Sequence, residues 1–359
     1  MNEKTINRTM SRDSNVELLR ICAMFFIICH HFIHNSLYSF SAGAAEGLTA
    51  EYGVYSLLDG LFYVGVNCFL LISGYYGIKL RARKIWSMYL QLAFYGAGCY
   101  LAESLMLHKP ITYTLITKSV FIFSHPCWWF VVNFLLLMFL SPWINQGIKQ
   151  MTKKQYLLAL IGLTFVQVYL GWFWQKERYD VDGYSLLNFV YIYVIGGYIG
   201  RFVSKESIEK RRWSMLCTYV ACAILWGICN VLRLYIQMPF GRIYGYNNPI
   251  VICGAISLFL FFLSWQFKNK YVNWLAGGAF AAYLITDTQY VGYHLYFTYD
   301  KFIHSLNLHL WQVIGITLIV AAIIVLLCCC IDKLRAYIMK PLLPAFDWLD
   351  RKLGIIENE

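Results

Sequence analysis

Residues 15–34 read NVELLRICAMFFIICHHFIH, and this stretch decides the fold class. It is mostly apolar and about 20 residues long, which is the length that an α-helix needs to cross the hydrocarbon core of a bilayer. Further apolar stretches of this kind follow along the whole chain. We therefore expect an all-α protein that crosses the membrane many times.

The composition points to the same class. Hydrophobic residues make up 59% of the 359 residues and charged residues only 14%, whereas an average soluble domain has about 45–50% apolar and about 25% charged residues. A soluble protein of this length could not cover its surface with so few charges. The cysteines lie in apolar stretches without paired CxxC spacing, so we expect neither a disulfide framework nor a bound metal.

Ten segments are apolar and long enough to be membrane spans. They cover residues 16–36, 55–78, 85–107, 126–147, 156–174, 186–203, 213–236, 250–267, 272–290 and 310–331. An even number of spans places both termini on one side of the membrane. We expect a single integral-membrane domain over residues 1–359, with short cytoplasmic tails at residues 1–15 and 332–359.

The basic residues support this topology. A net charge of +11 in a soluble protein would suggest a nucleic-acid partner. With a cytoplasmic N-terminus, however, roughly three quarters of the Lys and Arg residues fall on the cytoplasmic side, as expected because positive segments resist translocation. Topology therefore accounts for the charge. We expect a multi-pass protein of the cell membrane with no nucleic-acid partner.

Ionisable side chains form a line along the first span. Arg20 and His31 are eleven residues apart, which places them within about 20° of one helix face and about 16 Å apart along the axis. Glu17 lies one turn before Arg20, and His34 lies one turn after His31, whereas His30 points about 100° away. Ionisable groups inside a span are costly and usually functional.

Two interpretations of this line of residues are open. In the first, Arg20 extends to the cytoplasmic interface, and the histidines hydrogen-bond to other helices. In the second, His31 lies near the middle of the membrane in its neutral form, which a general base or a nucleophile requires. The alignment of Arg20 with His31 favours the second interpretation.

Residues 65–84 read GVNCFLLISGYYGIKLRARK and form the second notable segment. Its Ser73-Gly74 pair would let another backbone or a ligand approach closely. The cations that follow either anchor the helix end or bind phosphate groups, because Arg binds phosphoryl oxygens in a bidentate manner. These cations are Lys79, Arg81, Arg83 and Lys84.

A third segment runs from Trp128-Trp129-Phe130 to Ser141-Pro142-Trp143-Ile144-Asn145. Together, the three segments resemble the membrane-bound acyltransferase-3 family, in the version common among polysaccharide O-acetyltransferases, and the similarity covers most of the chain. The resemblance implies transfer of an acyl group, usually acetyl, from cytoplasmic acyl-CoA to a glycan hydroxyl. The acceptor would be a cell-envelope or exported polysaccharide or its lipid-linked precursor.

The resemblance also implies roles for individual residues. His31 would be the catalytic histidine and Arg20 its partner on the first span. The residues expected to bind the donor are Ser73, Arg81, Arg83 and Lys84. Those expected to bind the acceptor or to support the site are Glu17, His34, Asn67 and Trp129. No metal is implied.

Two positions depart from the family pattern. Many members have Asp where this chain has Asn67, and many have His where it has Thr286, so the resemblance does not carry a second catalytic histidine over to the ninth span and leaves the role of Thr286 open. Asp59 and the pair Trp128-Trp129 are expected near the outer face. Aromatic residues there usually form an interface belt, and a sugar-stacking surface is the alternative.

The main alternative function is a transporter or flippase for a glycan or lipid, in which the line of His and Arg relays protons. The inverted repeat typical of many such transporters is not visible in the sequence. A membrane scaffold or sensor is a third interpretation, but it would not need the alignment of Arg20 with His31. The expected partners are therefore membrane lipid, an acyl-CoA donor and a glycan acceptor.

Overall fold

A computed structural model describes residues 13–38, 49–113, 117, 121, 128–176, 180, 182–236 and 242–352. Helices make up 81% of the structure, and no strand occurs in these ranges. The predicted all-α class is therefore confirmed. The predicted N-terminal tail lies outside the described residues up to position 12, and the C-terminal tail does so from position 353.

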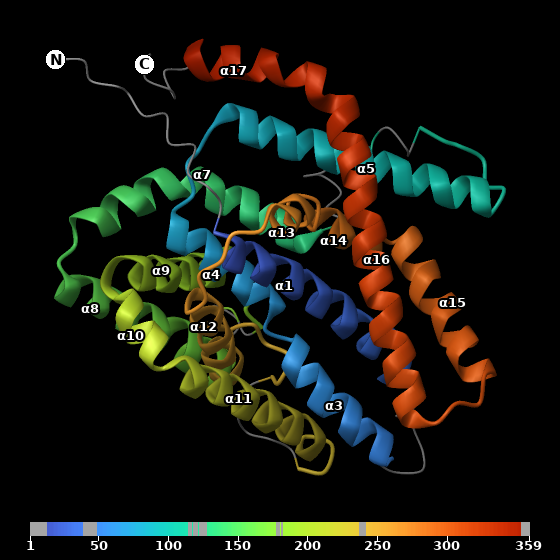
Figure 1. Cartoon of the computed structure of the whole chain (residues 1–359), viewed down its shortest axis with the longest axis horizontal. Coiled ribbons are helices and arrows are strands. Elements are labelled where there is room, and N and C mark those ends of the chain that lie inside the picture. Colours follow the sequence, from blue (N-terminus) through green and yellow to red (C-terminus); the bar gives the residue numbers. More distant parts are fainter. Residues whose placement is uncertain are drawn as a thin grey trace.

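The helices follow one another along the chain as shown in Figure 1. In order they are α1 (Ser14–Phe32), α3 (Ala50–Phe62), α4 (Gly65–Tyr76), α5 (Ala82–Met106), α7 (Trp129–Gln150), α8 (Lys153–Thr164), α9 (Leu186–Phe202), α10 (Lys205–Lys210), α11 (Arg212–Leu232), α12 (Pro249–Leu263), α13 (Lys270–Ala276), α14 (Phe280–Thr286), α15 (Val291–Ser305), α16 (Leu310–Met339) and α17 (Leu343–Lys352). Wider π-helical turns extend α1 to Leu37 and α8 to Phe173.

Within the part of the chain that the structure describes, six helical segments are long and apolar enough to cross a membrane. They are Ser14–Leu37, Ala50–Tyr76, Trp129–Gln150, Lys153–Phe173, Arg212–Leu232 and Leu310–Trp348. Two shorter apolar helices, α9 and α12, accompany them. The count of ten spans and the cytoplasmic position of both termini stay predictions.

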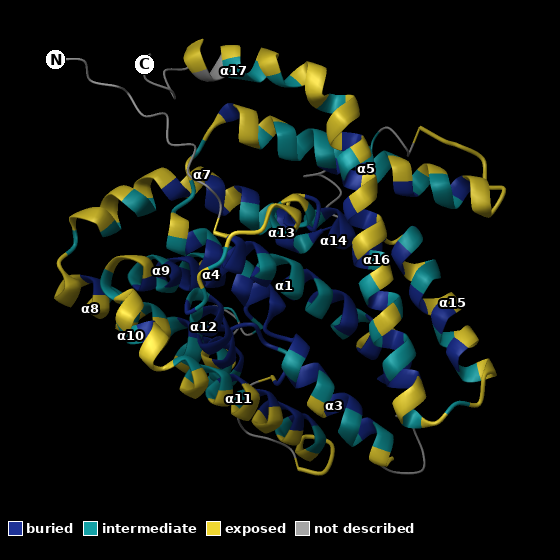
Figure 2. Ribbon diagram, viewed as in Figure 1, coloured by how far each residue is buried: buried dark blue, intermediate teal, exposed yellow. Residues whose placement is uncertain are grey.

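Helix α1 forms the centre of the bundle. It packs against α3, α4, α12, α13, α14 and α16, and most of its residues are buried (Figure 2). The peripheral helices expose apolar side chains instead, as on α16, where Ile319, Ile323 and Leu327 are each about half exposed or more. Because these three residues recur every fourth position, they form one apolar stripe, which is typical of a helix face in contact with lipid.

Two predicted spans are interrupted. The segment predicted at 55–78 is two helices, α3 and α4, which meet at Tyr63 and Val64. The segment predicted at 272–290 is likewise split into α13 and α14 around Gly277 and Gly278. A hydropathy pattern detects that such a segment is apolar, but it does not show that the helix is broken.

A further helix, α15, occupies residues 291–305, which were expected to be an outer loop. Tyr, His and Asp lower its hydropathy, yet its buried residues recur at helical spacing. These are Gly292, Tyr296, Tyr299 and Ile303. Helix α15 is therefore amphipathic, and it packs one face against the bundle.

The helix of the last predicted span continues past residue 331, because α16 ends only at Met339; the cytoplasmic tail at residues 332–359 stays a prediction. Asp332 is buried and accepts hydrogen bonds from Arg335, at 2.6 Å, and from Tyr95 and Gln91 of α5, each at 2.9 Å. A carboxylate with this many donors is tolerated inside the protein. Asp332 is thus packed against α5 within the bundle.

Helices α4 and α9 cross in close contact. A Cβ atom on Gly74 would lie 1.9 Å from the carbonyl oxygen of Tyr193, and one on Gly196 would lie 2.3 Å from that of Leu71. Only glycine permits such an approach. The close approach predicted at Ser73-Gly74 is therefore confirmed, and the approaching group is the backbone of α9.

Candidate active site

Helix α1 carries Arg20 and His31 without a break between them. Arg20 donates to Glu17 at 2.5 Å, and the Glu17 side chain is only 6% exposed. The predicted proximity of these two residues is confirmed. Eleven residues of continuous helix place His31 about 16 Å further along the axis than Arg20.

His31 faces α15. Its Nδ1 atom lies 3.4 Å from the hydroxyl of Tyr296, and the two rings meet edge to face with their centroids 6.0 Å apart. The carbonyl oxygen of His31 accepts from the side-chain amide of Asn35 at 2.9 Å. Both Tyr296 and Asn35 also line a cavity of about 360 Å³.

This cavity, which we call the polar cavity, has walls suited to hydrogen-bonding. Its polar residues are Asn35, Asp287, Thr288, Gln289, Tyr296 and Asp300. Amide, hydroxyl and carboxylate groups of this kind hydrogen-bond to the hydroxyls of a sugar. Thr286 also borders it, and its hydroxyl donates to the carbonyl of Ala282 at 2.8 Å.

His30 has a buried partner that the sequence analysis missed. Its Nδ1 atom lies 2.6 Å from Oδ1 of Asp59, and Tyr38 donates to the other carboxyl oxygen at 3.3 Å. Asp59 is completely buried within α3 rather than exposed in a loop, and its position near the outer face stays a prediction. The available signal was a lone carboxylate inside an apolar segment, which is usually paired or functional.

His34 lies closer to the His30 side of the helix than expected. Its ring is 5.6 Å from that of His30 and 5.5 Å from that of Tyr244. The reason is helical spacing. His34 is four residues after His30, a rotation of about 400°, and three residues after His31, a rotation of about 300°. The first rotation is closer to a whole turn, so His34 lies nearer to the face of His30. His31, whose ring is 5.7 Å from that of His30, is turned toward α15 instead.

Aromatic rings cover the histidines on the side opposite α15. Trp129 stacks on Tyr246 with centroids 5.4 Å apart, and Tyr246 stacks on Tyr63 at 5.0 Å. Tyr63 then meets His30 edge to face at 5.0 Å. The buried amide of Asn67 donates to the carbonyl of Tyr246 at 2.9 Å. Asn67 and Trp129 are therefore both connected to His30, through Tyr246 and Tyr63.

The interface-belt interpretation is wrong for Trp128, which is only 2% exposed. Trp129 is half-buried and packs against Tyr184 as well as Tyr246, with centroids 4.5 Å apart for the Tyr184 pair. These two tryptophans therefore pack inside the bundle, where sequence hydropathy alone could not distinguish them from belt residues.

The predicted donor-binding residues gather where α4 leads into α5. Arg81 precedes the first residue of α5 and is exposed. Arg83 forms an ion pair with Asp347 of α17 at 2.7 Å. Burial lowers the pKa of Lys84, and the charges of Arg81 and Lys79 lower it further. The hydroxyl of Ser73 donates to its own helix, to Phe69 at 2.8 Å.

The start of this cationic segment is held in place by the third sequence block. The backbone N–H of Ile78 donates to the hydroxyl of Tyr193 at 2.9 Å, and the carbonyl of Ile78 accepts from Asn145 at 2.9 Å. The Tyr193 hydroxyl in turn donates to Asn145 at 2.6 Å. One backbone unit is thereby fixed by two side chains from two different helices, α9 and α7.

These features define a helical membrane protein with histidines and a buried carboxylate inside an apolar bundle, beside a polar cavity. The chain belongs to the acyltransferase-3 family, whose acyltransferase domain matches residues 13–332. The match confirms the resemblance and supports acyl transfer as the activity. It ends before α17. No curated protein and no solved structure matches the chain.

Proposed function

We propose that this acyltransferase transfers an acyl group, acetyl in the usual case, from acyl-CoA to a hydroxyl of a polysaccharide or its lipid-linked precursor. The cell membrane is the proposed location, with the donor arriving from the cytoplasmic side. The observation that carries the proposal is the position of His31, which contacts Tyr296 at the wall of a polar cavity that opens at the protein surface.

The donor carries several negative phosphate charges, and the cationic segment supplies complementary charge. Arg81 and Arg83 would bind the phosphates, with Lys84 beside them. The pantetheine arm would then extend into the bundle, where Arg20 lies about 16 Å before His31 along α1. Arg20, already paired with Glu17, would bind a phosphate of the donor where the arm enters the bundle.

In the proposed reaction, His31 takes the proton from the sugar hydroxyl as the oxygen attacks the thioester carbon. A new C–O bond forms, the C–S bond breaks, and the CoA thiolate leaves and takes up a proton. The alternative route has His31 accept the acyl group first and pass it to the sugar. Single-turnover experiments without an acceptor distinguish the two, because only the second route yields an acylated protein.

His30 acts as a positioning residue in this scheme. Because a carboxylate only accepts hydrogen bonds, Asp59 requires a hydrogen on Nδ1 of His30, which fixes both the tautomer and the orientation of the ring. The fixed ring packs 5.7 Å from that of His31. Asp59 thereby limits the rotation of the His31 side chain through its neighbour.

The test uses purified protein in lipid vesicles with labelled acetyl-CoA. The proposal predicts transfer of label to oligosaccharide acceptors or, without them, slow hydrolysis of the thioester. A transporter would be inert toward acetyl-CoA and would instead show proton-coupled movement of a glycan across the vesicle membrane. That result would overturn the proposal.

A further inference from the structure

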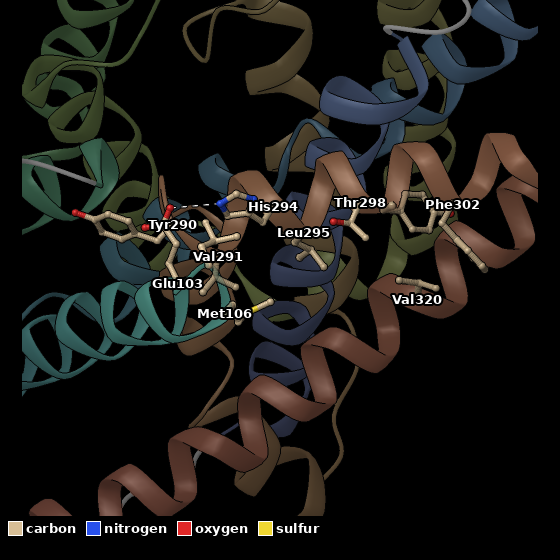
Figure 3. Close-up of a pocket in the computed structure, with 11 residues that line it drawn as sticks. Glu103, Met106, Tyr290, Val291, His294, Leu295, Thr298, Phe302 and Val320 are labelled. Carbon is tan, nitrogen blue, oxygen red and sulfur yellow. Dashed lines mark hydrogen bonds and ion pairs between the residues drawn. The ribbon is translucent and has the colours of Figure 1, made fainter. Parts of the chain in front are cut away.

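A second, apolar cavity lies between α5, α15 and α16, with a volume of about 570 Å³ (Figure 3). We call it the apolar groove. Its walls include Met106 from α5, Val291, Leu295 and Phe302 from α15, and Val320 from α16. Its chemistry differs from that of the polar cavity, which is lined by carboxylates, amides and hydroxyls.

The groove is open to the surface that faces lipid. Met106 is 73% exposed and Phe302 is 51% exposed, and both line the groove. Ile319 and Ile323 of α16, beside the groove-lining Val320, are exposed apolar residues as well. Water does not fill an apolar space of this kind, whereas a hydrocarbon molecule enters one readily. In a membrane, the groove therefore takes up a hydrocarbon chain.

One end of the groove is polar. There, Glu103 of α5 lies 3.3 Å from His294 of α15, and Lys109 donates to the same carboxyl oxygen at 3.1 Å (Figure 3). The Glu103 side chain is only 12% exposed. A groove with apolar walls and one ionic end matches an amphiphile, with a long chain and a polar group.

Helix α15 connects this groove to the candidate active site. Leu295 and Thr298 line the groove, and Tyr296 and Asp300 line the polar cavity beside His31. The two cavities thus lie on two flanks of one helix. A substrate that straddles α15 would place its hydrocarbon part on one flank and its hydroxyl-bearing part on the other.

We propose that the apolar groove binds the hydrocarbon chain of the acyl acceptor, so that the acceptor is a lipid-linked glycan rather than a free polysaccharide. This inference rests on the proposed acyltransferase function. Binding of the chain in the groove would hold the sugar at the polar cavity. Because the chain passes from one apolar medium, the bilayer, to another, its affinity for the groove would come from close packing against the walls rather than from the hydrophobic effect.

The kinetic test compares two acceptors with the same sugar, the methyl and the farnesyl glycosides of N-acetylglucosamine. Val320→Trp and Leu295→Trp fill the groove, and Ile319→Trp adds the same side chain on the lipid-facing surface of α16. We expect the two groove variants to raise KM for the farnesyl glycoside about tenfold or more and to leave kcat/KM for the methyl glycoside unchanged. The Ile319→Trp control should alter neither.

An equal loss of kcat/KM with the farnesyl and the methyl glycoside would show that the groove residues support only the fold of α15. No loss of kcat/KM with either acceptor would mean that an ordinary bilayer lipid occupies the groove. Both results overturn the proposal. A farnesyl glycoside with a photoreactive diazirine in its chain provides a readout without turnover. It should label peptides from α15 and α16 in the wild type but not in Val320→Trp. If labelling behaves so while no acetyl transfer occurs, the groove binds the chain, but the acyltransferase function fails and with it the assignment of that chain to an acyl acceptor.

Discussion

The buried pair of His30 and Asp59 gives the sharpest prediction about stability. Asp59 is completely buried, and its two carboxyl oxygens contact His30 at 2.6 Å and Tyr38 at 3.3 Å. Removing one partner leaves the other buried without its hydrogen bond, which costs about 1–3 kcal/mol, and more where that group is charged. Asp59→Asn keeps the volume and one acceptor, so we expect it to lower the free energy of unfolding by about 2–3 kcal/mol.

The assay is denaturant unfolding of the purified protein in detergent, followed by tryptophan fluorescence. Glu206→Gln is the matched control, because it breaks an exposed pair with Lys210 at 2.8 Å and should cost less than about 0.5 kcal/mol. A double-mutant cycle with His30→Asn should give a coupling energy of about 1–3 kcal/mol. Additive effects of the two substitutions, or equal losses for Asp59→Asn and the control, would refute the reasoning.

Three further predictions concern the α4–α9 crossing and the donor segment. Gly74→Ala should destabilise the protein by about 1–3 kcal/mol, because its Cβ would lie 1.9 Å from a carbonyl oxygen. Gly98→Ala is the control and should not destabilise the protein, because nothing lies within 4 Å of its Cβ. Thermal melting of the two variants checks both expectations. Arg81→Ala combined with Arg83→Ala should raise KM for acetyl-CoA more than it lowers kcat, and an unchanged KM would assign both residues to anchoring. Asp347→Ala removes a carboxylate that competes with the donor phosphates for Arg83, and it should lower KM for acetyl-CoA. The decrease should be at most about fivefold, because the side chains of Arg83 and Asp347 are both partly exposed. A raised KM for acetyl-CoA would contradict this prediction.

Local features of the site were predictable from the sequence. The proximity of Glu17 to Arg20 and the close approach at Gly74 depend on helical spacing and on the size of one residue, and both are confirmed. The positions of the apolar helices follow from hydropathy in the same way. Such features need no knowledge of which helices are neighbours.

Features that depend on tertiary packing were not predictable. His30 and Asp59 are 29 residues apart, and nothing in either segment indicates that α1 and α3 meet at that point. Helix α15 was missed because its polar residues lower its hydropathy. The surface against which its buried face packs is formed by other segments of the chain. The contact of His31 with Tyr296 joins residues 265 positions apart. Only the folded bundle brings these groups together.

The measurement that tests the central claim most directly is acetyl transfer by His31→Asn in lipid vesicles, with membrane abundance and melting temperature measured on the same preparation. His108→Asn, at an exposed histidine in the loop after α5, is the control. The account predicts a loss of about 100-fold or more for His31→Asn with unchanged abundance and melting, and wild-type rates for the control. A stable His31→Asn protein that transfers acetyl groups at the wild-type rate would contradict it.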